Sequence, residues 1–283
     1  MPALLKRMLI AAAMVAISTP ACSGPVTGRI YPAPQTKLTV DGMPDGTELL
    51  TVKSSDGIEL NGLYRPATGK DRPLILLLHG NASSAKTAIQ WLGLLADNGF
   101  GILSAEYRGY SGLSGTPSEA GLTDDAAAFL AEARRRAAGR PVWVVGHSLG
   151  GAVGLGLSRR ERLNQLVTIG TFTRLRDMAP KLTQGLVPDE YRNAEAVGAL
   201  DEPYALIHGL RDEIVPWQMG QELHKAAVTA KSRGTSYILS EAGHQPNAAL
   251  ILAVLNNIQA RAAGKSPPAL PLAVRAVSFV GTR

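Results

Sequence analysis

The feature that most constrains the fold of this chain is a regular alternation of short apolar runs with alanine-rich stretches. The runs have the length and composition of β-strands, and the stretches between them have helical spacing. The strand-like runs are LILLLH, GILSAEY, VWVVGH, QLVTIG, YALIHG and SYILS, and helices are predicted near 85–97, near 119–138, from Leu149, near 217–229 and near 246–262. This alternation predicts an α/β protein with a mostly parallel central sheet and helices on both faces. An antiparallel hairpin with its turn at Asp56-Gly57 is predicted before it.

One strand-to-helix junction carries a nucleophile motif. The run VWVVGHSLGG, residues 142–151, places the pattern G-x-S-x-G between a predicted strand and a predicted helix. In this context the glycines allow a tight turn that exposes Ser148, and side chains at 146 or 150 would collide with the neighbouring strand and helix. The helix start also presents N–H groups and a positive dipole end to a developing anion. The alternative is a plain strand-to-helix turn that contains a hydroxyl.

Partners for Ser148 follow it in the order that this chemistry needs. A serine nucleophile requires a base that is oriented by an acid, and in this architecture the order along the chain is Ser, Asp or Glu, then His. Asp212 follows a late strand in YALIHGLRDEIVP, and His244 follows the last predicted strand in SYILSEAGHQPN. Asp212 is preferred to Glu213 and Asp201 because its loop faces the strand ends. The remaining histidines are expected to be structural, solvated or fillers of the motif: His79, His147, His208 and His224.

A second motif invites a different interpretation. In LILLLHGNASSAKT, residues 74–87, Gly80, Lys86 and Thr87 fit the phosphate-loop pattern G-x-x-x-x-G-K-[ST], but Ala85 replaces its second glycine. Because that glycine lets the loop curl around phosphate, we expect Lys86 and Thr87 only to begin a helix. The sequence also lacks H-E-x-x-H or another clustered ligand set, so no metal and no cofactor are predicted.

Five motifs in order along the chain together resemble the α/β-hydrolase superfamily, within its small-lid, serine-aminopeptidase-like branch. They are His79-Gly80-Asn81, Tyr107-Arg108-Gly109-Tyr110, the turn at 146–150, His208-Gly209 with Asp212, and Gly243-His244. The resemblance covers about residues 45–262 and implies an α/β-hydrolase fold with a short lid insertion. It also implies an oxyanion hole formed by the N–H groups of Asn81 and Leu149. In this branch the strand before Arg108 usually ends in Asp, whereas this chain has Glu106.

The alternation of strands and helices stops between Gly170 and Leu200, and loops of this length are usually functional. In the resembled family this insertion is a lid over the nucleophile. Phe172 and Met178 are therefore candidates for binding an acyl group. The alternative is that the apolar residues of this insertion only cover the sheet edge.

These observations lead to the hypothesis of a serine hydrolase that cleaves carboxylic esters or thioesters. Ser148 would form an acyl-enzyme, His244 would transfer the proton and Asp212 would orient the imidazole. The expected partner is a small-molecule acyl ester or thioester. Two alternatives stay open: a peptidase or amidase that uses the same triad, and a catalytically silent, lipid-tethered binding protein with the same fold.

The N-terminal 21 residues have the layout of a secretory signal peptide, with Lys6 and Arg7 before an apolar run and small residues after it. Cys22, the only cysteine, closes Ser-Thr-Pro-Ala-Cys, which resembles the lipidation box of bacterial lipoproteins, although Thr19 stands where Leu is usual. The expected location is the cell envelope or periplasm, with a lipid anchor at Cys22 on a bacterial membrane. Cleavage after Ala21 with full release, and an uncleaved anchoring helix, are the alternatives.

The predicted organisation has four parts: a signal peptide at 1–21, a tether at 22–45, an α/β-hydrolase domain at 46–262 with its lid at about 171–200, and a C-terminal tail at 263–283. The formal net charge is +6. Two of the cations lie in the signal peptide and three in the tail, where no acidic residue balances them, so the rest of the chain is nearly neutral. Its cations are interleaved with acids, and no nucleic-acid-binding groove is predicted.

Overall fold

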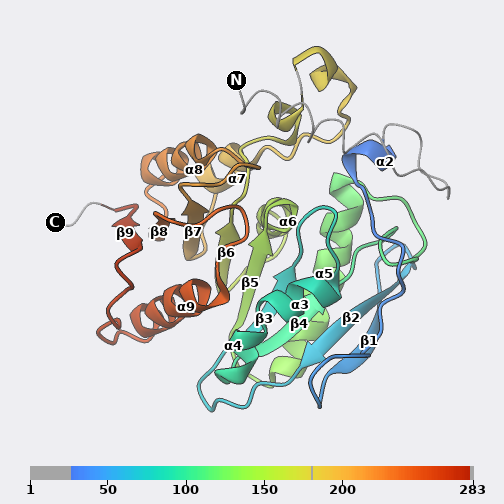
Figure 1. Cartoon of the computed structure of the whole chain (residues 1–283), viewed down its shortest axis with the longest axis horizontal. Coiled ribbons are helices and arrows are strands. Elements are labelled where there is room, and N and C mark those ends of the chain that lie inside the picture. Colours follow the sequence, from blue (N-terminus) through green and yellow to red (C-terminus); the bar gives the residue numbers. More distant parts are fainter. Residues whose placement is uncertain (1–26, 180, 281–283) are drawn as a thin grey trace.

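A nine-stranded sheet forms the centre of the molecule (Figure 1), in a computed structural model that describes residues 27–179 and 181–280. The strand order is β1-β2-β4-β3-β5-β6-β7-β8-β9. The strands are β1 (Glu48–Lys53), β2 (Glu59–Arg65), β3 (Leu74–Leu78), β4 (Gly101–Ala105), β5 (Val142–His147), β6 (Gln165–Ile169), β7 (Tyr204–Gly209), β8 (Gly234–Leu239) and β9 (Val274–Ser278). The strands from β4 to β8 are parallel, whereas β1, β2 and β9 pair antiparallel at the two edges. The predicted α/β fold with a mostly parallel sheet is confirmed.

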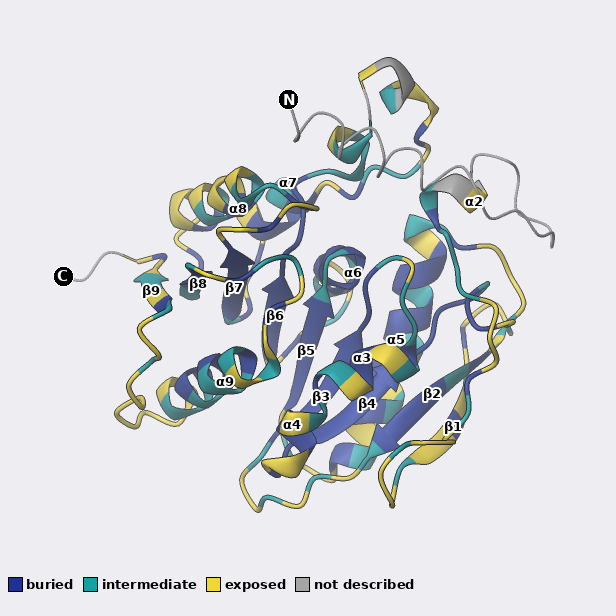
Figure 2. Ribbon diagram, in the orientation of Figure 1, coloured by how far each residue is buried: buried dark blue, intermediate teal, exposed yellow. Residues whose placement is uncertain are grey.

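Helices cover both faces of this sheet, as the sequence predicts. One face packs against α5 (Glu119–Ala137), α6 (Leu149–Ser158), α7 (Asn193–Gly198) and α8 (Trp217–Thr229). The other packs against α3 (Ala85–Trp91), α4 (Gly93–Asp97) and α9 (Ala248–Ala262). Along β3, Leu76 and Leu78 belong to the first core and Ile75 and Leu77 to the second. The central parallel strands β3, β4, β5 and β6 are therefore buried on both sides (Figure 2), which explains their continuous apolar runs.

Local signals place the first hairpin and the start of α3. The hairpin turns where predicted, since the N–H of Gly57 donates to the carbonyl of Ser54 between β1 and β2. Ser84 caps α3 by accepting a hydrogen bond from the N–H of Thr87. The run Ala85-Lys86-Thr87 therefore begins a helix, as expected, and Lys86 reaches the carbonyl of Asp41 on the surface.

The segment at 27–45 differs from the tether that the sequence suggests. It begins with the short helix α2 (Thr27–Ile30) and then packs along the domain, where Tyr31 and Leu38 are buried. The Tyr31 hydroxyl donates a hydrogen bond of 2.6 Å to Asp189, so this segment is joined to the predicted lid. The apolar side chains of Tyr31 and Leu38 explain the docking, because burying them in the two cores removes their surface from water.

The C-terminal tail also differs from the prediction, which left residues 263–283 outside the domain. Val274–Ser278 form β9, and this strand extends the sheet beyond β8. Phe279 is buried and stacks on Tyr204, with 5.6 Å between ring centroids. The short alternating sequence of this strand gave no signal, because its pairing depends on an edge formed by distant residues.

The insertion predicted at about 171–200 holds little regular structure. It contains the 3-10 turns η1 (Leu175–Met178) and η2 (Lys181–Leu186), and then α7. Across the described ranges, no helix has the length and apolar character needed to cross a membrane. The predicted signal peptide and Cys22 lie outside the described residues.

Candidate active site

Ser148 occupies a strained turn between β5 and α6. Its backbone has φ of 52° and ψ of −114°, a conformation that non-glycine residues adopt rarely and at a cost of about 1–3 kcal/mol. The flanking glycines make the turn possible, since a Cβ on Gly146 would lie 2.3 Å from the carbonyl oxygen of Gly150, and one on Gly150 would lie 2.0 Å from that of Leu78. These are the collisions that the sequence predicts. The turn presents the Ser148 side chain at the carboxyl end of the sheet.

His244 and Asp212 meet through a hydrogen bond. His244 Nδ1 lies 2.8 Å from Asp212 Oδ2, and the Asp212 side chain is fully buried. The other carboxylate oxygen, Oδ1, accepts hydrogen bonds from the N–H groups of Ile214 and Val215 at 2.9 and 2.8 Å. Burial raises the pKa of Asp212, but the hydrogen bond and charge of His244 and the Val215 N–H outweigh it and lower this pKa below its ordinary value. Asp212 is therefore ionised at neutral pH and holds the proton of His244 on Nδ1, which leaves Nε2 free to act as a base.

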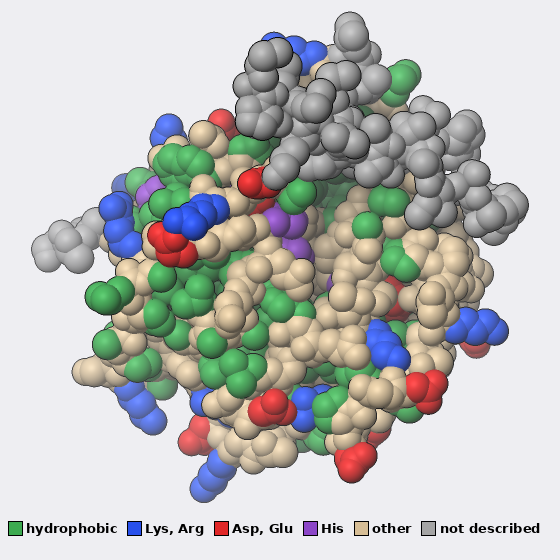
Figure 3. All heavy atoms as spheres, viewed as in Figure 1, with side chains coloured by type: hydrophobic (Ala, Val, Ile, Leu, Met, Phe, Trp, Pro, Cys, Tyr) green, Lys and Arg blue, Asp and Glu red, His purple; other side chains and the backbone are tan. Residues whose placement is uncertain are grey.

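A cavity of about 350 Å³ contains both Ser148 and His244. Figure 3 shows histidine side chains near the centre of this face of the molecule, in a hollow of the surface. The wall of the cavity is formed by the end of β3 and the turn after it, one side of α3, the end of β5 with Ser148, and the loop that bears His244. Its residues are Leu77, His79, Gly80, Asn81, Ala82, Ser83, Thr87, Ala88, Trp91, His147, Ser148, His244 and Gln245. Most of this wall is apolar or neutral, and none of these residues is an acid, a lysine or an arginine.

The two predicted oxyanion donors lie beside the serine. Leu149 is the first residue of α6, so its N–H has no acceptor within the helix and is available to an anion. Gly80 approaches so closely that a Cβ would be 3.4 Å from Cβ of Ser148, and Asn81 follows it in the cavity wall. The Asn81 side chain is anchored, since its amide donates to the carbonyl of Ile30 at 2.6 Å and its oxygen accepts from the Tyr110 hydroxyl at 2.8 Å.

The predicted lid residues Phe172 and Met178 do not line this cavity. Phe172 is buried in the core, edge-on to Tyr191 with 6.2 Å between ring centroids, and Met178 packs against the same core. Glu119 fixes the later part of the insertion, because its carboxylate accepts the N–H groups of Glu190 and Tyr191 at 3.0 Å. These contacts give Phe172 and Met178 places in the packing of the domain, and the expectation that they bind an acyl group stays a prediction.

Sequence reasoning missed two residues that hold the loop bearing His244. His147, expected only to fill the motif, has its Nε2 2.8 Å from the carbonyl oxygen of His244, so Nε2 carries a proton and donates. Burial lowers the pKa of His147 to about 4, and the charge of His244 contributes in the same direction. Trp91 donates its indole N–H to the carbonyl of Pro246 at 2.8 Å. The motif G-x-S-x-G marks position 147 only as variable. The partner of His147, the carbonyl of His244, lies 97 positions away, so no local pattern predicts the contact.

Comparison with known proteins finds hydrolases among the proteins that this chain resembles. The family model described as serine aminopeptidase, S33, matches residues 69–192. An uncharacterized protein of Mycobacterium tuberculosis is 32% identical over 197 residues, which cover 67% of this chain and 70% of that protein. The lysophosphatidylserine lipase ABHD12 of Macaca fascicularis is 29% identical over 197 residues, or 60% of this chain and 49% of the lipase. An esterase of Pyrococcus furiosus has a similar fold, with a TM-score of 0.62, 17% identity and coverage of 82% of this chain and 96% of the esterase.

Proposed function

The chain belongs to the α/β-hydrolase superfamily and is of the serine-hydrolase type, and from this premise we propose that it hydrolyses carboxylic esters or thioesters of neutral acyl groups. The observation that carries the proposal is the hydrogen-bonded pair of His244 and Asp212 at the same cavity as the strained Ser148. A nucleophile, a base and an acid that orients the base are the parts that acyl transfer requires.

In the proposed mechanism Ser148 Oγ attacks the acyl carbon while His244 Nε2 accepts its proton. The carbonyl oxygen gains a negative charge, which the N–H groups of Asn81 and Leu149 stabilise. Collapse of this intermediate breaks the bond to the leaving oxygen or sulfur, and His244 returns its proton to that group. A water molecule, deprotonated by His244, then attacks the acyl-enzyme, and release of the acid restores Ser148.

The cavity wall supports esters of neutral acyl groups over substrates with a free amino terminus. An aminopeptidase must hold the ammonium group of its substrate, and a carboxylate near the nucleophile is the usual means. No acidic side chain is present among the described residues that line the cavity. The similarity to a lysophosphatidylserine lipase also supports an ester substrate.

The test is a panel of p-nitrophenyl esters, acyl thioesters and aminoacyl anilides, assayed with the purified enzyme and with Ser148→Ala as the blank. We expect turnover of esters or thioesters that Ser148→Ala lacks. Preference for aminoacyl anilides would replace this proposal with a peptidase or amidase that uses the same triad. A folded protein that turns over none of the three classes would support a silent binding protein.

We also propose that the enzyme is exported and attached to a bacterial membrane through a lipid on Cys22. The support is the sequence alone, in which a basic and then apolar leader ends in Ser-Thr-Pro-Ala-Cys. Stable attachment requires more than one acyl chain, as lipoproteins have.

A further inference from the structure

The side chain of Glu106, at the end of β4, is completely buried, although the proposed mechanism gives it no part. Across residues 27–179 and 181–280, no lysine or arginine pairs with it. The nearby Arg108 instead binds Asp125 at 2.7 Å and Asp56 at 2.6 Å. Burying a carboxyl group is costly unless its oxygens are hydrogen-bonded, so the partners of Glu106 indicate what it does.

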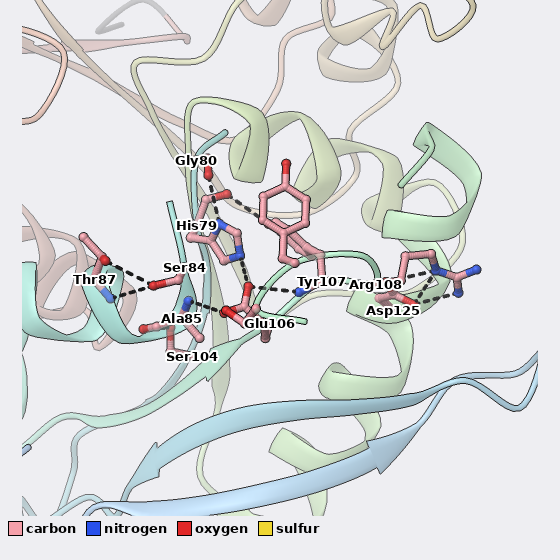
Figure 4. A network of polar contacts seen from close by, with 12 residues as sticks. His79, Gly80, Ser84, Ala85, Thr87, Ser104, Glu106, Tyr107, Arg108 and Asp125 are labelled. Carbon is pink, nitrogen blue, oxygen red and sulfur yellow. Dashed lines mark hydrogen bonds and ion pairs between the residues drawn. The ribbon is translucent and has the colours of Figure 1, made fainter. Parts of the chain in front are cut away.

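Two of those partners, His79 and Ala85, stand at the two ends of one turn (Figure 4), and the N–H of Tyr107 also donates to Oε1 at 3.3 Å. Oε1 lies 2.7 Å from Nε2 of His79, which directly follows β3. Oε2 accepts the N–H of Ala85, the first residue of α3, at 3.0 Å, and the hydroxyl of Ser111 at 2.7 Å. One carboxyl group thus joins the two ends of the turn 80–84, which includes Asn81.

The link from His79 continues to the peptide that contains the proposed oxyanion donor. Nδ1 of His79 lies 2.8 Å from the carbonyl oxygen of Gly80, and because a carbonyl only accepts, Nδ1 carries a proton and donates. The carbonyl of Gly80 and the N–H of Asn81 belong to one planar peptide unit and point in opposite directions. Holding the carbonyl toward His79 therefore fixes the direction of the Asn81 N–H. A carbonyl that accepts a hydrogen bond also polarises the N–H of its own peptide and strengthens it as a donor.

We propose that Glu106 is a positioning residue for the oxyanion hole, which it orients through His79 and the Gly80–Asn81 peptide. The proposal rests on the hydrolase function proposed above, because it assigns a role to Asn81 in stabilising the oxyanion. Glu106 binds Nε2 of His79 and so determines both the orientation of the ring and the nitrogen that faces Gly80. This holds whether the proton between the two side chains resides on the carboxyl or on the imidazole.

The test compares Glu106→Met with Glu106→Gln. Methionine has a similar length but cannot hold His79 or Ala85, so we expect kcat to fall by about 100-fold while KM stays within about threefold, at the lower end of the range seen when an oxyanion donor is lost. Glutamine can donate its amide N–H to His79 Nε2 and accept from Ala85, so kcat is expected to stay within about fivefold of wild type. Affinity for a trifluoromethyl ketone, whose adduct with serine carries an oxyanion, should fall by the same factor as kcat.

Two further variants separate positioning from general destabilisation. Tyr107→Phe removes a buried hydroxyl that donates to the carbonyl of His79 at 3.1 Å, and it leaves the Gly80–Asn81 peptide untouched. We expect this matched control to retain kcat and inhibitor affinity. His79→Phe keeps an aromatic ring beside Tyr107 and Tyr110 but loses the donor to Gly80, so its kcat and inhibitor affinity should fall as in Glu106→Met. If Glu106→Met does not fold, His79→Phe takes its place in the test.

Wild-type kcat and inhibitor affinity in a folded Glu106→Met or His79→Phe protein would overturn the positioning role, as would an equal loss in Tyr107→Phe. Either outcome leaves the hydrolase proposal intact, because the wild-type enzyme would still be active. Absence of turnover and of inhibitor binding in wild type itself would instead remove the hydrolase proposal, and the positioning role with it.

Discussion

Ser148 has a strained backbone, and the glycines two residues before and after it cannot be replaced by residues with a side chain. A Cβ at Gly146 or Gly150 would lie within 2.3 Å of backbone atoms, which cannot move without disturbing β3 or α6. At the same scale, His147 connects this turn to the loop of His244 through a single hydrogen bond. One motif therefore contains the proposed nucleophile, Ser148, and the adjacent residue, His147, that holds the loop of the proposed base.

The low pKa of His147 predicts how the free energy of unfolding changes with pH. The unfolded chain takes up a proton at His147 near pH 6.5, its ordinary pKa, whereas the folded protein takes it up only near pH 4. Between these values the unfolded state binds more protons, so this group lowers the free energy of unfolding as the pH falls from about 6.5 to about 4. His147→Gln keeps an N–H donor but does not titrate, so its stability should fall less over that range. Urea denaturation at several pH values measures this, and parallel curves for the two proteins would contradict it.

The residues of the candidate site divide into those that the sequence predicts and those that it does not. Ser148, Asp212 and His244 each follow a recognisable strand, and in a parallel sheet the strand ends meet at one edge. Trp91, His147 and Glu106 act through partners from other segments, the carbonyls of Pro246 and His244 and the ring of His79. Such contacts depend on packing between distant elements and leave no local pattern to read.

Among the elements, α3 rather than the insertion at 171–200 forms the apolar wall of the cavity. Ala88 and Trp91 lie on the side of α3 that faces the serine. The break in the alternation of strands and helices marks the insertion in the sequence, but the way in which the insertion docks has no local signal. Apolar side chains suit a protein core as well as a substrate, and the contact of Glu119 with the backbone at 190–191 is one of the long-range contacts that dock the insertion.

Chain-length preference should therefore respond to Trp91 and not to Phe172. Trp91→Ala enlarges the cavity, so the ratio of kcat/KM for octanoyl to that for acetyl p-nitrophenyl ester should change by about fivefold or more, because each methylene in an apolar pocket is worth about 1 kcal/mol or more. Phe172→Ala should leave the ratio unchanged and lower the free energy of unfolding by about 3 kcal/mol or more, as buried aromatic truncations do. The ratio is insensitive to a uniform loss of activity from the missing Trp91 hydrogen bond. A larger change in ratio for Phe172→Ala would restore the lid to the substrate site.

At the scale of the whole molecule, both flanking segments take part in the domain. The sequence predicted the central sheet because its strands carry their own apolar signal, whereas β9 and the docked segment from Tyr31 to Leu38 depend on surfaces that the rest of the chain creates. Docking of Ile30 against Asn81 brings the N-terminal segment to the edge of the cavity.

The proposed lipid anchor at Cys22 is tested by Cys22→Ser in a bacterial host. We expect wild-type protein in the membrane fraction with the mass of a lipidated cysteine, and the variant to lose both, because a serine cannot receive the thioether-linked lipid of a lipoprotein. Wild-type protein recovered as a soluble periplasmic species without lipid mass would favour cleavage after Ala21 and full release.

The central claim is that Ser148 is a nucleophile activated by His244 and Asp212, and covalent labelling with a fluorophosphonate measures it most directly. Only a serine with an aligned base and a preorganised oxyanion hole attacks such phosphorus at a useful rate. We expect mass spectrometry to find the adduct on Ser148, no adduct in Ser148→Ala, and labelling slowed by about 10³-fold or more in His244→Ala, since the residues act as a unit. Asp212→Asn should label at an intermediate rate, because it favours the wrong imidazole tautomer. A folded wild-type protein that carries no adduct on Ser148 would contradict the account.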